Sequence, residues 1–142
     1  MIVKVFDEFV TDAKNIREKV FIDEQGFSYD YDEFDDIAVH MVLYNDGEPI
    51  GACRIFEQEE KGVFFFGRLA VKKECRKNGA GSKLVEAAKE YAFSHGATRV
   101  ILHAQLQARD FYLKLGFVEY GEIEYEEDCP HIWMKFDKQS VF

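Results

Sequence analysis

The sequence has few cysteines, and their spacing excludes the roles that cysteine most often plays in small proteins. The chain of 142 residues contains three of them, Cys53, Cys75 and Cys129, and no Cys-x-x-Cys pair. An odd number of widely spaced thiols predicts neither a disulfide framework nor a structural zinc site. We therefore expect no bound metal and a reducing, cytoplasmic location.

Long apolar runs and basic residues are also scarce. No stretch of the chain approaches the roughly 20 apolar residues that a membrane-spanning helix needs, and the N-terminus lacks the features of a secretory signal. With 18 basic and 27 acidic residues, the formal net charge is −9. Since binding to nucleic acid needs a broad basic surface, we expect neither nucleic acid nor a membrane as a partner.

Aromatic residues are abundant instead, with 14 Phe and 7 Tyr in a chain that is 47% hydrophobic. This length and composition predict one domain, residues 1–142, with a sizeable core. Short apolar runs and amphipathic segments predict strands near 2–6, 37–44, 49–56, 64–71, 99–103, 117–123 and 132–136, and helices near 11–21, 80–94 and 105–114. We predict an α/β fold: a mixed, mostly antiparallel twisted sheet of six to seven strands, flanked by about four helices.

Residues 64–95 are predicted to form a buried strand, a basic glycine-containing turn and an amphipathic helix. From residue 68 to residue 85, six side chains are basic and only Glu74 is acidic, the reverse of the charge balance of the whole chain. A turn before a helix presents free N–H groups and the positive end of the helix dipole, and glycines let an anion approach the main chain. The turn at residues 76–82 is therefore predicted to bind phosphate; an ordinary turn with a solvated basic face is the alternative.

Two common phosphate-binding loops do not match this turn. A P-loop needs glycine at position 76, and a dinucleotide fingerprint needs a third glycine where Leu84 stands. The pattern Arg76-x-x-Gly79-x-Gly81 does match [RQ]-x-x-G-x-[GA], the acetyl-CoA pyrophosphate signature of the GNAT superfamily of N-acetyltransferases. A later segment, A-x-x-F-Y-x-x-L-G-F at 108–117, matches another motif of that superfamily.

The chain thus resembles the GNAT superfamily over almost its whole length. The segments V-F-I-x-E-Q-G at 20–26 and P-H-I-x-M at 130–134 are similar to its small bacterial ElaA/YjcF-type branch, and the second is also similar to glyphosate N-acetyltransferases. The resemblance implies the GNAT fold and direct transfer of an acetyl group from acetyl-CoA to a primary amine of a small molecule, in a ternary complex. The arginines of the glyphosate enzymes are missing, which argues against an acidic substrate.

The resemblance also implies roles for single residues. The amides of Leu69 and Val71 would bind pantetheine and polarise the thioester carbonyl, and Tyr112 would protonate the leaving thiolate; the alternative for Tyr112 is a helix-face aromatic. Gln105 replaces a frequent asparagine, seven positions before Tyr112. The implied cofactor-binding residues are Leu69, Ala70, Val71, Arg76, Lys77, Asn78, Gly79, Ala80, Gly81, Ser82, Gln105 and Phe111.

His131 and Glu24 are the candidates for the general base. An ordinary imidazole titrates near ~6.5 and so can take a proton from an ammonium group at neutral pH. His131 could equally be a strand-end histidine bonded to the backbone, and Glu24 could orient the amine or act through water. His40 and His103 lie in apolar strands and are expected to be core histidines.

Residues 23–36 contain seven carboxylates and no Lys or Arg, interleaved with four aromatic residues. Two interpretations stay open for this acidic segment. It forms either a charged surface over a small aromatic cluster or one wall of the acceptor site, where its field would attract a cationic amine.

Two functions besides small-molecule acetylation stay open. The acidic segment could recruit a basic peptide to a protein or peptide N-acetyltransferase, or the domain could be a non-catalytic acyl-CoA-binding module. The late strands or the Phe-rich surface could also join two copies into a homodimer.

Overall fold

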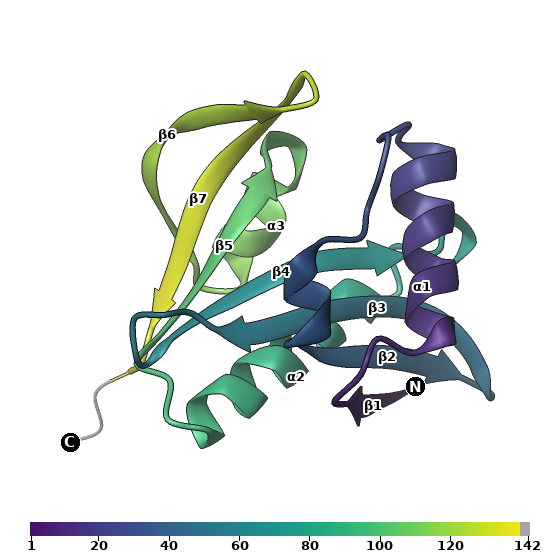
Figure 1. Ribbon diagram of the computed structural model, residues 1–142, viewed down its shortest axis with the longest axis horizontal. Coiled ribbons are helices and arrows are strands. Elements are labelled where there is room, and N and C mark those ends of the chain that lie inside the picture. Colours follow the sequence, from purple (N-terminus) through teal and green to yellow (C-terminus); the bar gives the residue numbers. More distant parts are fainter. Residues whose placement is uncertain (140–142) are drawn as a thin grey trace.

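The computed structural model describes residues 1–139, in which seven strands form one sheet in the order β1-β2-β3-β4-β5-β7-β6 (Figure 1). Neighbouring strands are antiparallel except for the parallel pair β4 and β5. The expected mixed, mostly antiparallel sheet is confirmed. The strands are β1 (Ile2–Phe6), β2 (Val39–Asn45), β3 (Glu48–Glu57), β4 (Val63–Val71), β5 (Arg99–Gln105), β6 (Val118–Glu126) and β7 (Cys129–Asp137).

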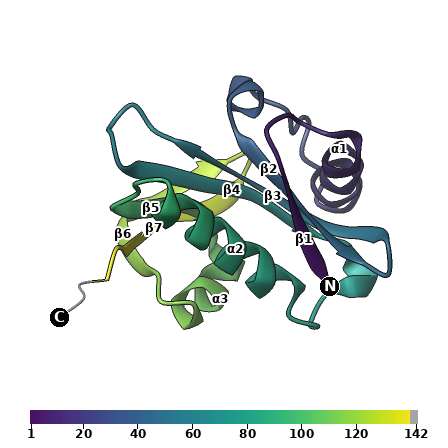
Figure 2. The ribbon, with the colours of Figure 1, turned by 90° about the horizontal axis from the view of Figure 1, so that it is seen from below.

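Helices cover both faces of the sheet, α1 on one face and α2 with α3 on the other (Figure 2). The described residues hold three α-helices rather than about four, because the other helical turns are a π-helical extension of α1 and short 3₁₀ turns. None of these helices is long and apolar enough to span a membrane. The helices are α1 (Thr11–Arg17), η1 (Glu18–Glu24, π), η2 (Glu33–Asp36, 3₁₀), η3 (Lys73–Cys75, 3₁₀), α2 (Ala80–Ser94), η4 (Leu106–Ala108, 3₁₀) and α3 (Arg109–Lys114).

The apolar spacing of each long helix explains the face that it buries. Residues three and four apart on a helix share one side, so the apolar residues of α1 and η1 point to the sheet. They lie in one core cluster with Val42, Ala52 and Ala70 of the central strands, whereas α2 packs into a larger cluster on the opposite face. The buried positions of these helices are Ala13, Ile16, Val20, Phe21, Ala80, Leu84, Val85, Ala88 and Ala92.

The parallel strands β4 and β5 stay together over three residue pairs only, Val63–Phe65 with Arg99–Ile101. Beyond this short seam, β4 pairs with β3 alone and β5 with β7 alone. The two strands therefore diverge and divide the sheet into two halves, β1–β4 and β5–β7 (Figure 1).

A bulge interrupts β4 just beyond the seam. Ala70 pairs with Ala52 and Gly67 with Arg54, so two residues of β4, Arg68 and Leu69, lie opposite one residue of β3. Arg68 adopts a left-handed conformation with φ of +51°. Since a bulge removes backbone groups from the ladder, it leaves main-chain donors and acceptors free where β4 has left β5.

Candidate active site

The turn at residues 76–82 lets other groups approach its main chain closely. Gly79 precedes α2 with φ of +80°, and a side chain there would meet no atom within 4 Å. Lys77 is also left-handed, with φ of +69°. Because the first turn of a helix has N–H groups without intrahelical partners, this turn presents backbone donors and basic side chains together.

Gly81 and Phe111 connect this turn to α3. A Cβ on Gly81 would lie 3.2 Å from Cζ of Phe111, so any other residue would have to move the ring. The Phe111 ring in turn meets the Tyr112 ring edge-on, with centroids 5.0 Å apart. Phe111 therefore contacts the turn through Gly81 and the neighbouring tyrosine through its ring.

Arg76 and Glu24 were predicted for different roles, and the structure pairs them. Two guanidinium nitrogens of Arg76 donate to the two carboxylate oxygens of Glu24, each over 2.6 Å, and Nε donates to the carbonyl of Val71. The hydrogen bonds from Arg76 hold the pKa of Glu24 below its ordinary value. Glu24 is thus a weakly basic anion tied to the turn at residues 76–82, an arrangement that does not favour it as a general base.

A cavity of about 830 Å³ lies between the diverging strands. Its lining includes Leu69 at the bulge of β4, Tyr112 of α3, and Gln105 and His131 of the other half of the sheet. Residues that are far apart in the sequence thus face one space, and the predicted proton donor and the preferred base are among them.

Tyr112 is buried among the rings of Phe66, Phe111 and Phe117, with only 7% of its surface exposed. This burial raises the pKa of its phenol well above the ordinary value. The hydroxyl therefore keeps its proton at neutral pH and can donate it into the cavity.

The ring of His131 is fixed by a backbone group at the start of β7. Its Nδ1 lies 2.9 Å from the carbonyl oxygen of Cys129, and since a carbonyl only accepts, Nδ1 carries a hydrogen. Its Nε2 lies 3.1 Å from a carboxylate oxygen of Glu126. The backbone bond fixes the ring, and Nε2 is the ring nitrogen directed toward Glu126.

His103 belongs to the same group, although its apolar strand suggested a core role. Its ring stacks on Trp133 with centroids 4.4 Å apart and lies 4.9 Å from the ring of His131. Burial lowers the pKa of His103, which keeps the imidazole neutral. Strand alternation could have revealed it, because His103 stands two residues before Gln105 and so faces the same side.

The acidic segment forms one wall of the cavity, but its inward carboxylates are paired. Each of three arginines binds two of three aspartates, over distances of 2.6 to 3.2 Å. Burial would raise the pKa of Asp35, yet hydrogen bonds from Arg17 and the charges of Arg17 and Arg54 lower it to about 2. The prediction that these carboxylates attract an amine is therefore wrong. The network consists of Arg17, Arg54, Arg68, Asp30, Asp32 and Asp35.

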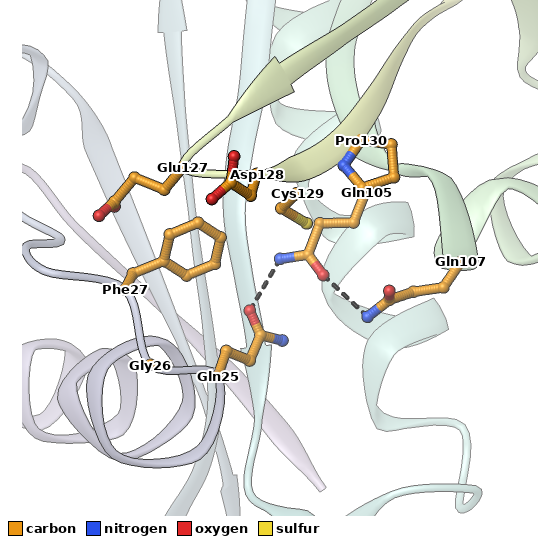
Figure 3. A pocket seen from close by; sticks show the side chains of 9 residues that line it. All are labelled: Gln25, Gly26, Phe27, Gln105, Gln107, Glu127, Asp128, Cys129 and Pro130. Carbon is orange, nitrogen blue, oxygen red and sulfur yellow. Dashed lines mark hydrogen bonds between the residues drawn. The ribbon is translucent and has the colours of Figure 1, made fainter.

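Hydrogen bonds join this wall to the other half of the sheet. Nε2 of Gln105 donates to Oε1 of Gln25 over 2.8 Å, and Gln107 donates to Gln105 over 3.0 Å (Figure 3). Nearby, Oγ of Ser28 donates to Glu127 over 2.6 Å. A second cavity of about 640 Å³ opens at this bridge. The Gln105 amide is thus engaged with protein groups.

Metal ligands do not cluster in the described part of the chain. No group of three or more His, Cys, Asp or Glu side chains within residues 1–139 is placed to hold a metal ion.

The chain is similar to known acetyltransferases. A family model described as "Acetyltransferase (GNAT) family" matches residues 4–117. The uncharacterized N-acetyltransferase YjcF of Bacillus subtilis is 34% identical over 134 residues, which cover 92% of this chain and 94% of YjcF. The crystal structure of Escherichia coli ElaA has a TM-score of 0.83 at 27% identity, covering 94% of this chain and 97% of ElaA.

A more distant structure shares the fold. An aminoglycoside 6′-N-acetyltransferase complexed with coenzyme A has a TM-score of 0.73 at 18% identity, and the match covers 96% of this chain and 97% of that chain. The likeness to ElaA/YjcF-type proteins that was expected from the sequence is confirmed.

Proposed function

Because this chain belongs to the GNAT family of acetyltransferases, we propose that it moves an acetyl group from acetyl-CoA to a primary amine of a small molecule. The observation that carries this proposal is the cavity between β4 and β5, which Tyr112, His131 and the β4 bulge share. Its two ends have different tasks, one toward the donor and one toward the acceptor.

The donor end fits coenzyme A. The backbone amides of residues 77–82 and the basic side chains around them would hold the pyrophosphate, and the open side of Gly79 leaves room for it. The free backbone groups at the bulge, near Leu69, Ala70 and Val71, would bind pantetheine and polarise the carbonyl. An aminoglycoside acetyltransferase of the same fold is complexed with coenzyme A, which supports this assignment.

The protein groups move two protons. Acetyl-CoA supplies a thioester whose carbonyl carbon the amine attacks. Nε2 of His131 would take a proton from the ammonium group, which frees the nitrogen lone pair that forms the new C–N bond. As the C–S bond breaks, the hydroxyl of Tyr112 would give its proton to the departing sulfur. The nitrogen, which still carries one proton more than an amide, would release that proton to the tyrosinate this leaves, so that amide, free thiol and Tyr112 are all neutral.

Thiol release tests this proposal directly. Acetyl-CoA and a panel of primary amines should yield free coenzyme A, and Tyr112→Phe should lower kcat by about 10²-fold with unchanged coenzyme A binding by calorimetry. Tyr125→Phe is the matched control, since Tyr125 is 70% exposed on β6 and does not line the cavity. Equal rates for the two variants would remove Tyr112 as the proton donor.

The other functions predict different results. Tight binding of acetyl-CoA without thiol release from any amine would favour a non-catalytic acyl-CoA-binding module. Acetylation of a basic peptide was argued from the acidic segment, and the pairing of Asp30, Asp32 and Asp35 with arginines weakens that argument. We also propose a cytoplasmic location, consistent with three free thiols, while a homodimer stays a prediction.

A further inference from the structure

Building on the proposed function, we infer that the acceptor is an arylalkylamine: a cationic primary amine joined by a short chain to an aromatic ring, without a carboxylate. The ring would lie on a row of aromatic side chains along the cavity. The ammonium group would lie against Glu126, within reach of His131. Three separate features of the cavity support this substrate class.

The first feature is a continuous row of aromatic rings, drawn from four strands. Phe56 of β3 stacks on its cross-strand neighbour Phe65 of β4, with centroids 5.4 Å apart. Phe65 meets Trp133 of β7 edge-on at 5.7 Å, and Trp133 stacks on His103 of β5 at 4.4 Å. All four line the cavity, so the row is an aromatic surface that presents both ring faces and ring edges, against which another ring can pack.

The second feature is uncompensated negative charge at the histidine end of the row. Glu126 reaches His131 Nε2 at 3.1 Å and His103 Nδ1 at 3.5 Å, and Glu124 accepts from the indole of Trp133 at 3.3 Å. Among the described residues neither carboxylate pairs with Lys or Arg, and both side chains are more than half exposed. They are therefore free to bind an ammonium group.

The arginine side chains that line the cavity are already paired with carboxylates. Arg54 and Arg68 line it, but Arg54 binds Asp32 and Asp35, and Arg68 binds Asp30 and Asp32. An acceptor with a carboxylate would therefore meet like charge from Glu124 and Glu126 without a free cation to bind it. The cavity selects for net positive charge.

The third feature is an unpartnered atom. The side chain of His103 is only 10% exposed, and its Nε2 is buried without a hydrogen-bond partner. Because the ring is neutral and Nδ1 faces Glu126, Nε2 retains a lone pair that can accept a hydrogen bond. Buried polar atoms are rarely left unsatisfied, and an ammonium group of the acceptor would satisfy this one.

A set of three matched amines tests the inference. With acetyl-CoA present, 2-phenylethylamine should show a kcat/KM about tenfold or more above that of n-butylamine, which lacks the ring. Phenylalanine keeps the ring and the amine but adds a carboxylate, and it should be at least as poor. If n-butylamine or phenylalanine matches 2-phenylethylamine, the substrate class is wrong while the acetyltransferase proposal stands.

Binding can be read separately from turnover. Trp133 is the only tryptophan of the chain and lies in the aromatic row, so its fluorescence should change saturably when 2-phenylethylamine is added to the protein with coenzyme A. Saturable binding with no thiol release from any amine would overturn the proposed function and keep the binding site. No saturable change would overturn the inference.

Two variants locate the effect. Glu126→Gln should lower kcat/KM for 2-phenylethylamine about tenfold, whereas Glu122→Gln, an exposed position on the same strand outside the cavity, should leave it unchanged. Trp133→Leu should abolish the preference for 2-phenylethylamine over n-butylamine; a general folding defect would lower both rates and preserve their ratio. An unchanged ratio contradicts the role of the aromatic row.

Discussion

Two groups of carboxylates lie at the same cavity and differ in what faces them: Asp30, Asp32, Glu124 and Glu126 line it, and Asp35 is buried and shares the arginines of the first two. Asp30, Asp32 and Asp35 follow η1 and are bound by three arginines. Glu124 and Glu126 lie on β6 and face histidines and a tryptophan. Asp30, Asp32 and Asp35 therefore stabilise one wall of the cavity through ion pairs, whereas Glu124 and Glu126 remain available to bind a cationic ligand. The charge of a segment in the folded protein depends on the partners that the fold brings to it.

The cost of breaking each group should differ accordingly. In the first group Arg17, Arg54 and Asp35 are buried, so removal of one of them leaves another charge uncompensated in the interior. In the second group the carboxylates are exposed, and water can replace a lost contact. The following four predictions test this contrast, from the largest expected effect on stability to the smallest.

Asp35→Ala should lower the free energy of unfolding by about 3–5 kcal/mol, because buried Arg17 and Arg54 would each lose a carboxylate. Urea unfolding measures this change. Asp36→Ala is the control, since Asp36 is exposed and, within residues 1–139, its side chain bonds only to the hydroxyl of Tyr31. Similar losses at positions 35 and 36 would contradict the structural role of the buried network.

Acid should weaken the wild-type protein through the same residue. The pKa of Asp35 is lowered from 3.8 to about 2, so its contribution is complete above pH 3.8 and is lost as the pH falls toward 2. With about 1.4 kcal/mol for each pKa unit, this loss amounts to roughly 2 kcal/mol. Unfolding measured between pH 5 and pH 2 should show a shallower slope in Asp35→Ala than in the wild type; equal slopes would contradict the assignment.

Glu24→Gln should change stability by less than about 1 kcal/mol, because its ion pair with Arg76 is exposed. The same change should tighten acetyl-CoA binding a few-fold, since the pyrophosphate would no longer compete with a carboxylate for Arg76. Calorimetry measures the affinity, with Glu74→Gln as the control for lost charge in the same turn. Weaker binding would instead mean that Glu24 positions Arg76 for the ligand.

Glu126→Gln should alter the free energy of unfolding by no more than about 0.5 kcal/mol, the smallest effect of the series. Glu126 is largely exposed, and without its charge His131 keeps the bond to the carbonyl of Cys129 and His103 keeps its stack on Trp133. The same urea measurement applies. A loss comparable to that of Asp35→Ala would remove the distinction between the two groups of carboxylates.

The sequence predicted features that depend on near neighbours. The strands near 37–44 and 49–56 form the hairpin β2–β3, and the Asn45-Asp46-Gly47 turn between them has Asp46 and Gly47 both left-handed, because hairpin turns are determined by their own residues. The glycine-containing turn before α2 was predicted for the same reason. Its glycines, basic residues and helix start lie within one short segment.

Features that depend on distant pairing could not be predicted in this way. The arginines that bind the acidic segment lie 13 to 38 positions from their partners, so its composition alone suggested a field that the fold cancels. To predict that His103 lies in the site, one would have to know the register of β5 with β7, which places it opposite Trp133. The acceptor end of the cavity is assembled from five strands, β3 to β7, and no single motif describes it.

The short seam between β4 and β5 also has a mechanical consequence. Gln105 lies four residues beyond the last paired residue of β5, about 13 Å along the strand, so a rotation of about 5° at the seam would shift it by roughly 1 Å. A misplacement of about 1 Å can slow a reaction about 10²-fold. The Gln25–Gln105 and Ser28–Glu127 hydrogen bonds join the two halves of the sheet far from the seam. At that distance even weak bonds oppose such a rotation effectively.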